Sequence, residues 1–236
     1  MTPGQGQSPT ADEKLKNEFN RWADEGRGEE MERHHIPITE PVLAMMHLQA
    51  DDRVLDLGCG AGWATRLLAA RVPQGKVVGV DISDEMVRRA QQASRDFSNI
   101  SYTVGSAEKL PSEDNVFTKV LSVESFYYYE DQGRALDELF RVMAPGGRFF
   151  ILINLYADNP LSLRWVESLK VPAHGLSKKQ YIELISWHGF YGVEARQIPD
   201  PSPTPEEYSG KWFKNAAELR EFKRIGALLL MANKPG

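Results

Sequence analysis

Short apolar runs alternate with amphipathic stretches through the middle of the chain. Each run has the length of a buried strand, and the stretches between the runs have the three-to-four-residue spacing of helices. Alternation of this kind implies right-handed crossovers, so the pattern predicts an α/β fold with a doubly wound, mostly parallel sheet and helices on both faces. Strands are predicted at 53–57, 76–81, 100–104, 116–122, 148–155, 190–197 and over the closing ALLLMANK, and helices at 63–71, 84–97, 132–143 and 177–188.

Two of these helices have recognisable ends. Ser83 can cap the helix over 84–97, and two acids follow it in the first turn, where the helix dipole favours negative charge. The helix over 132–143 is expected to stop at the Ala-Pro-Gly-Gly sequence, because proline and glycine do not continue a helix.

The segments on either side of this alternating region are less regular. Residues 1–11 are rich in Gly, Pro, Gln and Ser and are expected to be disordered, and 12–49 are expected to form a helical arm before the main domain at 50–236. Within that domain, about 155–176 and 199–215 are polar but contain aromatic residues, which is typical of a lid over a binding site. A solvated connector is the alternative interpretation.

Composition narrows the class of protein. The chain of 236 residues carries a net charge of −5, so no overall positive field attracts nucleic acid. The single cysteine excludes an internal disulfide, and the five histidines have no metal-ligand spacing, so no metal site is expected. No secretory signal is recognisable, and the apolar runs are too short to span a bilayer. We therefore expect a soluble, cytoplasmic protein without membrane insertion, whose oligomeric state the sequence leaves open.

The stretch VLDLGCGAGWATRLLA combines a strand, a turn with three glycines and the start of a helix. Its glycines are spaced as Gly58-x-Gly60-x-Gly62, whereas a dinucleotide-binding turn has glycine at the first, third and sixth positions. The sixth position is Trp63, whose indole hinders the close packing that a third glycine permits. Asp56, at the end of the strand, suits a cation better than a pyrophosphate. The turn therefore disfavours a dinucleotide.

A second acid ends the next strand. Asp81 follows the glycine turn at about the separation at which an acid binds ribose hydroxyls in a βαβ unit. Acids at two neighbouring strand ends would hold a nucleoside on one side and a positive group on the other. The pattern thus indicates a nucleoside that carries an amino acid instead of phosphates.

Four motifs in order, VLDLGCGAG, VVGVDIS, VGSAEKLPSEDNVFTKVLSVES and APGG, resemble those of class I S-adenosylmethionine-dependent methyltransferases. The resemblance is strong over about residues 40–155 and weaker in the tail. It implies a Rossmann-like fold with a seven-stranded sheet, S-adenosylmethionine as cofactor and S-adenosylhomocysteine as product. The implied partner is a small-molecule methyl acceptor.

The resemblance also assigns a cofactor site. Asp56 would lie near the ammonium of the methionine part, either in direct contact or through water. Asp81 would accept from both ribose hydroxyls, and Ile82 would cover one adenine face. Family members often have Asp where Ser106 stands, which weakens the expected contact with the adenine amine. The implied cofactor residues are Asp56, Gly58, Cys59, Gly60, Asp81, Ile82, Ser106, Ala107, Glu108 and Ser122.

The sequence SVESFYYYED stands where this family often has acceptor-site residues. Glu124 could hold the cofactor ammonium, bind a cationic acceptor or act as a base. The three tyrosines are not expected all to face one pocket, and at most one of the adjacent His34 and His35 is expected to point inward. The catalytic candidates are Glu124, Tyr128 and His35, and the candidates for the substrate site and lid are Trp22, His34, Tyr127, Tyr156 and Trp212.

Three interpretations of function stay open. The first is methylation of a small molecule, for which Lys211 could meet an acceptor carboxylate. The second is a nucleic-acid methyltransferase. The negative net charge of the chain disfavours this function, and so does the lack of an Asn/Asp-Pro-Pro-aromatic motif after the fourth strand. The third is a cofactor-binding regulatory module without catalysis. Because acceptors such as thiolates arrive deprotonated, the sequence does not decide whether a base is used.

Overall fold

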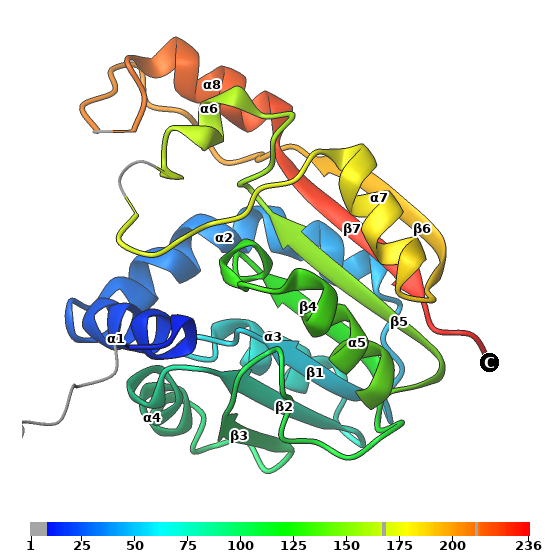
Figure 1. The fold of residues 1–236 in the computed structure, drawn as a ribbon. Coiled ribbons are helices and arrows are strands. Elements are labelled where there is room, and N and C mark those ends of the chain that lie inside the picture. The colour runs from blue at the N-terminus through cyan, green and yellow to red at the C-terminus, as the bar shows by residue number, and fades with distance from the viewer. Residues whose placement is uncertain (1–8, 167–168, 211) are drawn as a thin grey trace, which may run out of the picture.

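The computed structural model describes residues 9–166, 169–210 and 212–236. At its centre lies a seven-stranded sheet in the order β3-β2-β1-β4-β5-β7-β6 (Figure 1). The first five strands of the chain run parallel, and β7 runs antiparallel to both of its neighbours. The predicted fold class is confirmed. In the part of the chain that the structure describes, no helix is long and apolar enough to cross a membrane.

The strands and helices follow one another in the alternation that the sequence predicted. In chain order they are α1 (Ala11–Asp24), α2 (Arg27–Met45), β1 (Arg53–Leu57), α3 (Trp63–Arg71), β2 (Lys76–Asp81), α4 (Asp84–Ala93), β3 (Ile100–Val104), β4 (Phe117–Val123), the 3₁₀ helix η1 (Phe126–Tyr128), α5 (Gln132–Val142), β5 (Met143–Ile153), α6 (Pro160–Leu163), α7 (Lys178–Trp187), β6 (Tyr191–Ile198), α8 (Ala216–Ile225) and β7 (Ala227–Asn233).

Two boundaries differ from the prediction by more than two residues. Helix α4 ends at Ala93 instead of 97, and β5 begins at Met143, so the Ala-Pro-Gly-Gly sequence belongs to a strand. The helix before it does stop there, but Met143 pairs at once with Phe117 of β4, and the register then shifts before Lys119. The proline and glycines therefore lie in a bulge of the β4–β5 pair. Their sequence indicates a turn and gives no sign of strand pairing.

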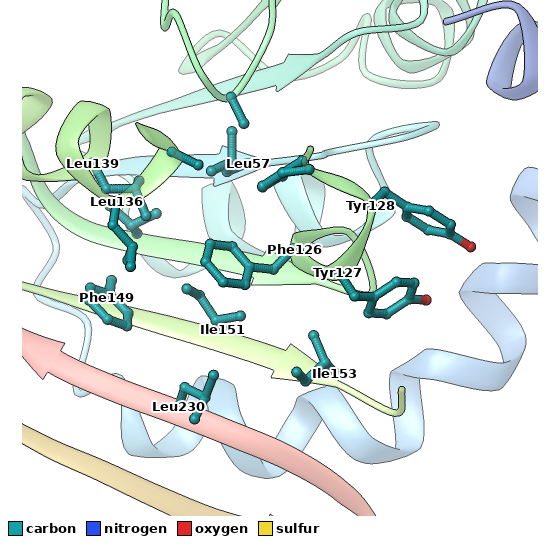
Figure 2. Packing of buried hydrophobic residues seen from close by; sticks show 14 of the residues in the cluster. Leu57, Phe126, Tyr127, Tyr128, Leu136, Leu139, Phe149, Ile151, Ile153 and Leu230 are labelled. Atoms are coloured by element: carbon teal, nitrogen blue, oxygen red, sulfur yellow. The ribbon is translucent and has the colours of Figure 1, made fainter. Parts of the chain in front are cut away.

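Strand β5 shows why the central strands read as continuous apolar runs. Its alternate side chains enter two different cores: Phe149 and Ile151 pack on the face covered by α4, α5 and α7, whereas Phe150 and Leu152 pack on the face covered by α2 and α3. Figure 2 shows the first of these cores, where Phe126 of η1 lies above β5. Burial on both faces explains why polar residues do not alternate with apolar ones along β5.

Helices α1 and α2 cross the carboxyl ends of these strands, and α1 packs on α4 (Figure 1). Asn20 makes the polar connection. Its Oδ1 accepts the Ser83 hydroxyl at 2.6 Å, and its Nδ2 donates to Asp84 Oδ1 at 3.0 Å. The Ser83 hydroxyl also accepts the Met86 amide and so caps α4, as the sequence predicted. The arm is thereby fixed to the start of α4.

We expect Asn20→Ala to release α1 from α4. The variant loses hydrogen bonds worth about 1 kcal/mol each, so amide exchange in Ala11–Asp24, followed by mass spectrometry, should become about tenfold faster. The matched control is Asn17→Ala, because Asn17 lies on the same helix and is exposed. Equal exchange in the two variants would contradict the role given to Asn20.

Candidate functional site

A cavity of about 1140 Å³ lies at the carboxyl ends of β1, β2 and β4. Helices α1 and α2 form one wall, and residues of α8 and of the chain before it form another. The volume exceeds what one drug-sized ligand needs, so a nucleoside and a second molecule fit together. The described residues contain no group of three His, Cys, Asp or Glu side chains placed to hold a metal ion.

The glycine turn after β1 forms the floor of this cavity. Gly58 has φ +74°, and a Cβ built there would lie 2.3 Å from the Ser125 hydroxyl oxygen. Gly60 has φ +50°, and a Cβ there would meet nothing within 4 Å. Gly58 therefore lets the turn pack on the segment after β4, whereas Gly60 leaves open space for a ligand to approach the backbone.

Asp81 lies beside this turn, at the end of β2, and borders the cavity. One carboxylate oxygen accepts the Gly60 amide at 2.9 Å and the other accepts the Ser83 amide at 2.9 Å. Burial raises the pKa of Asp81, and these backbone amides oppose that rise. Both oxygens are fixed in direction and keep lone pairs with which to accept hydroxyl groups.

Asp56 contacts α3 and does not reach the cavity. It is buried, it is not among the described residues that border the cavity, and one of its oxygens accepts the Thr65 hydroxyl at 2.6 Å. Burial, together with nearby Asp81, raises the pKa of Asp56 to about 7 against the opposing effect of Thr65. The carboxyl therefore joins β1 to α3, and a direct contact with a bound ammonium is not what this geometry favours.

The other residues predicted to bind the cofactor divide into two groups. Cys59, Ile82 and the turn Ser106–Glu108 border the cavity next to Asp81. Ser122 does not border it; this side chain is fully buried, and its hydroxyl is hydrogen-bonded to that of Ser125 at 2.8 Å. The structure thus brings the first group together at the cavity, whereas Ser122 lies behind Ser125 and does not reach the cavity.

Glu124 follows β4 and borders the same cavity. One of its oxygens accepts the Asn154 amide at 2.5 Å, and the other accepts the Tyr127 hydroxyl at 3.0 Å. Burial raises the pKa of Glu124 to about 7 against both hydrogen bonds. Its φ of +55° is unusual for a residue with a side chain, and such strain is concentrated at functional sites.

The expectation that the three consecutive tyrosines do not share one pocket is wrong. Tyr127, Tyr128 and Tyr129 are all buried and all border the cavity. The tight turn of η1 brings the first two rings together, tilted by 52° with centroids 4.5 Å apart, and Figure 2 shows their hydroxyls on the same side. The Tyr129 hydroxyl instead reaches Ser125 at 2.9 Å, below the glycine turn.

Both adjacent histidines also border the cavity, whereas at most one was expected to point inward. The cavity adjoins a wide sector of α2, from Arg27 to Ile38, so residues on more than one side of the helix reach it. His34 is exposed and His35 is half-buried. Burial and the neighbouring His34 lower the pKa of His35 to about 4, which keeps its imidazole neutral at pH 7.

The remaining candidates lie on the walls, with one exception. Trp22 borders the cavity from α1, and Trp212 borders it from the segment before α8. Tyr156 does not belong to a lid: it is fully buried, and its hydroxyl donates to the Gly226 carbonyl at 3.1 Å. Its aromatic ring packs in the hydrophobic core. The polar residues around it in the sequence did not indicate this burial. Lys211 lies outside the described residues.

Ser125 is the residue that sequence reasoning missed. Its hydroxyl donates to the Leu57 carbonyl at 3.1 Å and also contacts Ser122 and Tyr129. It thereby joins the ends of β1 and β4 under the glycine turn. Its position between Glu124 and the tyrosines was the available signal, but only the tertiary fold shows what the hydroxyl touches.

We expect Gly58→Ala to destabilise the protein far more than Gly60→Ala. Each introduces Cβ at positive φ, which costs about 1–2 kcal/mol, but only the first also collides with Ser125. Thermal unfolding of the two variants should show the larger loss of Tm in Gly58→Ala. A similar loss in both would mean that backbone strain alone governs this turn.

Comparison with known proteins agrees with this geometry. A family profile described as a methyltransferase domain matches residues 55–151. The demethylmenaquinone methyltransferase of Symbiobacterium thermophilum is 41% identical over 124 residues, which are 51% of this chain and 48% of that protein. The corresponding enzyme of Lactiplantibacillus plantarum is 34% identical over 157 residues, or 63% and 66% of the two chains. The chain thus spans about half to two thirds of these relatives.

Solved structures extend the similarity to nearly the whole chain. A chain in the complex of the Haloferax volcanii Trm112 methyltransferase activator superposes with a TM-score of 0.87 and 32% identity, covering 93% of this chain and 98% of that one. Geranyl diphosphate C-methyltransferase from Streptomyces coelicolor A3(2), solved with S-adenosyl-L-homocysteine, shares the fold with a TM-score of 0.75 at 16% identity, over 97% and 100% of the chains. The predicted family and its cofactor are confirmed: the chain belongs to the class I S-adenosylmethionine-dependent methyltransferases.

Proposed function

We propose that this protein transfers a methyl group from S-adenosylmethionine to a small, apolar organic acceptor and leaves S-adenosylhomocysteine. The observation that carries the proposal is the buried carboxylate of Asp81, fixed by two backbone amides beside the open space at Gly60. A cytoplasmic location is part of the same proposal.

The cofactor half of the cavity suits a nucleoside. The Asp81 oxygens are placed to accept from a pair of hydroxyls, which is a charge-assisted contact. Ile82 and Ala107 offer apolar surface to a planar base, and the backbone at Gly60 offers room for the amino-acid part. When bound, the cofactor supplies an electrophilic methyl group on a sulfonium. Trp63 occupies the position where a dinucleotide site has its third glycine.

The acceptor half is walled by aromatic side chains. Phe19 and Trp22 of α1 meet Tyr128 edge to face, with ring centroids 5.1–6.2 Å apart, and Trp212 lies on the opposite wall. These rings exclude water and orient an apolar molecule, and such positioning is the main source of rate in a displacement at carbon. Relatives named for a menaquinone precursor support an acceptor of this kind.

The two other functions are less well supported. A nucleic-acid methyltransferase is disfavoured by the net charge of −5. A regulatory module without catalysis needs no acceptor half at all. Turnover of the cofactor in the presence of apolar acceptors separates the first function from both alternatives.

Calorimetric titration tests the cofactor assignment. We expect S-adenosylmethionine to bind and NAD to give no heat, and Asp81→Ala to weaken binding of the former at least tenfold, because charge-assisted hydrogen bonds are worth about 1.5–3 kcal/mol. Asp96→Ala is the matched control, since Asp96 is exposed. Unchanged affinity in Asp81→Ala would remove Asp81 from the site, and heat from NAD alone would refute the proposed function.

We also propose a protein partner of the Trm112 type. The support is the neighbouring structure at 32% identity, which was solved in complex with that activator. Coexpression with the Haloferax volcanii activator, followed by size-exclusion chromatography, is expected to yield a joint peak with both chains. Separate elution of the two proteins at micromolar concentration would contradict this part of the proposal.

A further inference from the structure

Glu124 lies where the two halves of the cavity meet. The next residue, Ser125, lies under the glycine turn of the cofactor half, and Tyr127 begins the aromatic wall of the acceptor half. We propose that Glu124 accepts a proton from the acceptor, with Tyr127 as its positioning residue, and that the acceptor is an apolar ring compound with an ionisable hydroxyl. This inference rests on the proposed function and names the substrate class of the same site.

The geometry holds the Glu124 carboxyl in one orientation. The Asn154 amide and the Tyr127 hydroxyl each bind a different oxygen, at 2.5 and 3.0 Å. Each oxygen keeps a lone pair, so the group can still receive a proton. The backbone of Glu124 is held at φ +55°, a conformation that costs about 1–3 kcal/mol and that the pairing of its amide with the Leu152 carbonyl maintains.

Burial makes this carboxyl suitable as a base near neutral pH. It raises the pKa of Glu124 to about 7, whereas His35, the other candidate base, has its pKa lowered to about 4. Burial also raises the pKa values of Tyr127 and Tyr128, so both phenols stay neutral. The titratable and charged side chains that border the same cavity as Glu124 are Asp12, Glu18 and Arg21 of α1, Arg27, Glu30, Arg33, His34 and His35 of α2, Cys59, Asp81, Glu108, Tyr127 and Tyr128 of η1, Tyr129, Lys170, Asp200, Tyr208 and Lys223 of α8.

Proton transfer to Glu124 also balances charge in the cavity. The hydroxyl proton moves to a Glu124 oxygen, and the electron pair that it leaves on the acceptor forms the new bond to the methyl carbon. The pair of the broken methyl–sulfur bond stays on sulfur. One positive and one negative charge disappear together, so no uncompensated charge remains on the reacting groups.

The same carboxylate disfavours acceptors that arrive as anions. A thiolate or carboxylate next to ionised Glu124 would place two like charges close together in a medium that screens them poorly. A ring with a hydroxyl enters neutral, packs on Trp22 and Tyr128, and gives up its proton only as the new bond forms. Transfer to the hydroxyl oxygen and transfer to a conjugated ring carbon both use the electron pair that this proton leaves. At a ring carbon the product is first the keto form, which regains its hydroxyl when the proton on that carbon is lost to water and the oxygen is reprotonated. Analysis of the product distinguishes the two.

Proton release on ligand binding tests the role of Glu124 without turnover. A bound sulfonium should lower the pKa of Glu124, so at pH 7 S-adenosylmethionine should release up to about half a proton more from this group than S-adenosylhomocysteine does. Calorimetry in buffers of different ionisation enthalpy measures the release. The Glu124 contribution should vanish in Glu124→Gln and persist in Glu130→Gln, the matched control, whose side chain is exposed. Identical release in all three proteins would overturn the proposal.

The pH dependence of kcat gives the second test, with naphthol and dihydroxynaphthalene as probes. Because the ionised carboxylate is the active form, kcat should rise with pH to a plateau above about 7. Glu124→Gln should lower kcat about 100- to 10,000-fold while affinity for S-adenosylhomocysteine stays within threefold. Tyr127→Phe removes a hydrogen bond that lowers the pKa of Glu124, so the rise should move to higher pH.

The outcomes separate this inference from the function on which it rests. Full kcat in Glu124→Gln, or an unmoved pH profile in Tyr127→Phe, overturns the role of the pair. Turnover of benzenethiol without turnover of either ring hydroxyl, or no turnover of any probe, overturns the acceptor class. Failure of the unaltered protein to bind S-adenosylmethionine overturns the proposed function instead.

Discussion

The carboxylate of Asp81 connects the parts of the molecule on which the site depends. Its hydrogen bonds to the Gly60 and Ser83 amides join the turn after β1 to the start of α4. Ser83 continues the connection through its hydroxyl to Asn20 of the arm. A buried acid with these partners is stable only while the turn, the helix cap and the arm keep their relative positions, so the floor and one wall of the cavity are set together.

The sequence predicted the parts of this arrangement that depend on local pattern. The ends of β1 and β2 follow from apolar runs that are buried on both faces, and those ends place Gly58 and Asp81 at one edge of the sheet. The cap of α4 at Ser83 follows from residue type and position. Each of these features depends either on residues close to it in the sequence or on the spacing of apolar residues within one strand or helix.

The rest depends on contacts between distant segments. Tyr156 stands in a stretch that reads as a loop, but it is buried because β7 passes beside it and Gly226 accepts its hydroxyl. Asp56 was expected beside a ligand, and Thr65 of the next helix holds it instead. The tyrosines share one cavity because η1 turns tightly after β4, and the sequence did not reveal this turn.

The sheet order also has a consequence for folding. Strand β7 follows β5 and β6 in the chain, yet it lies between them (Figure 1). Until β7 inserts, β6 has no neighbour in the described sheet and the apolar edge of β5 stays uncovered. The sheet is therefore complete only when β7 has paired with both strands, and the exposed edge of β5 is open to wrong pairing until then.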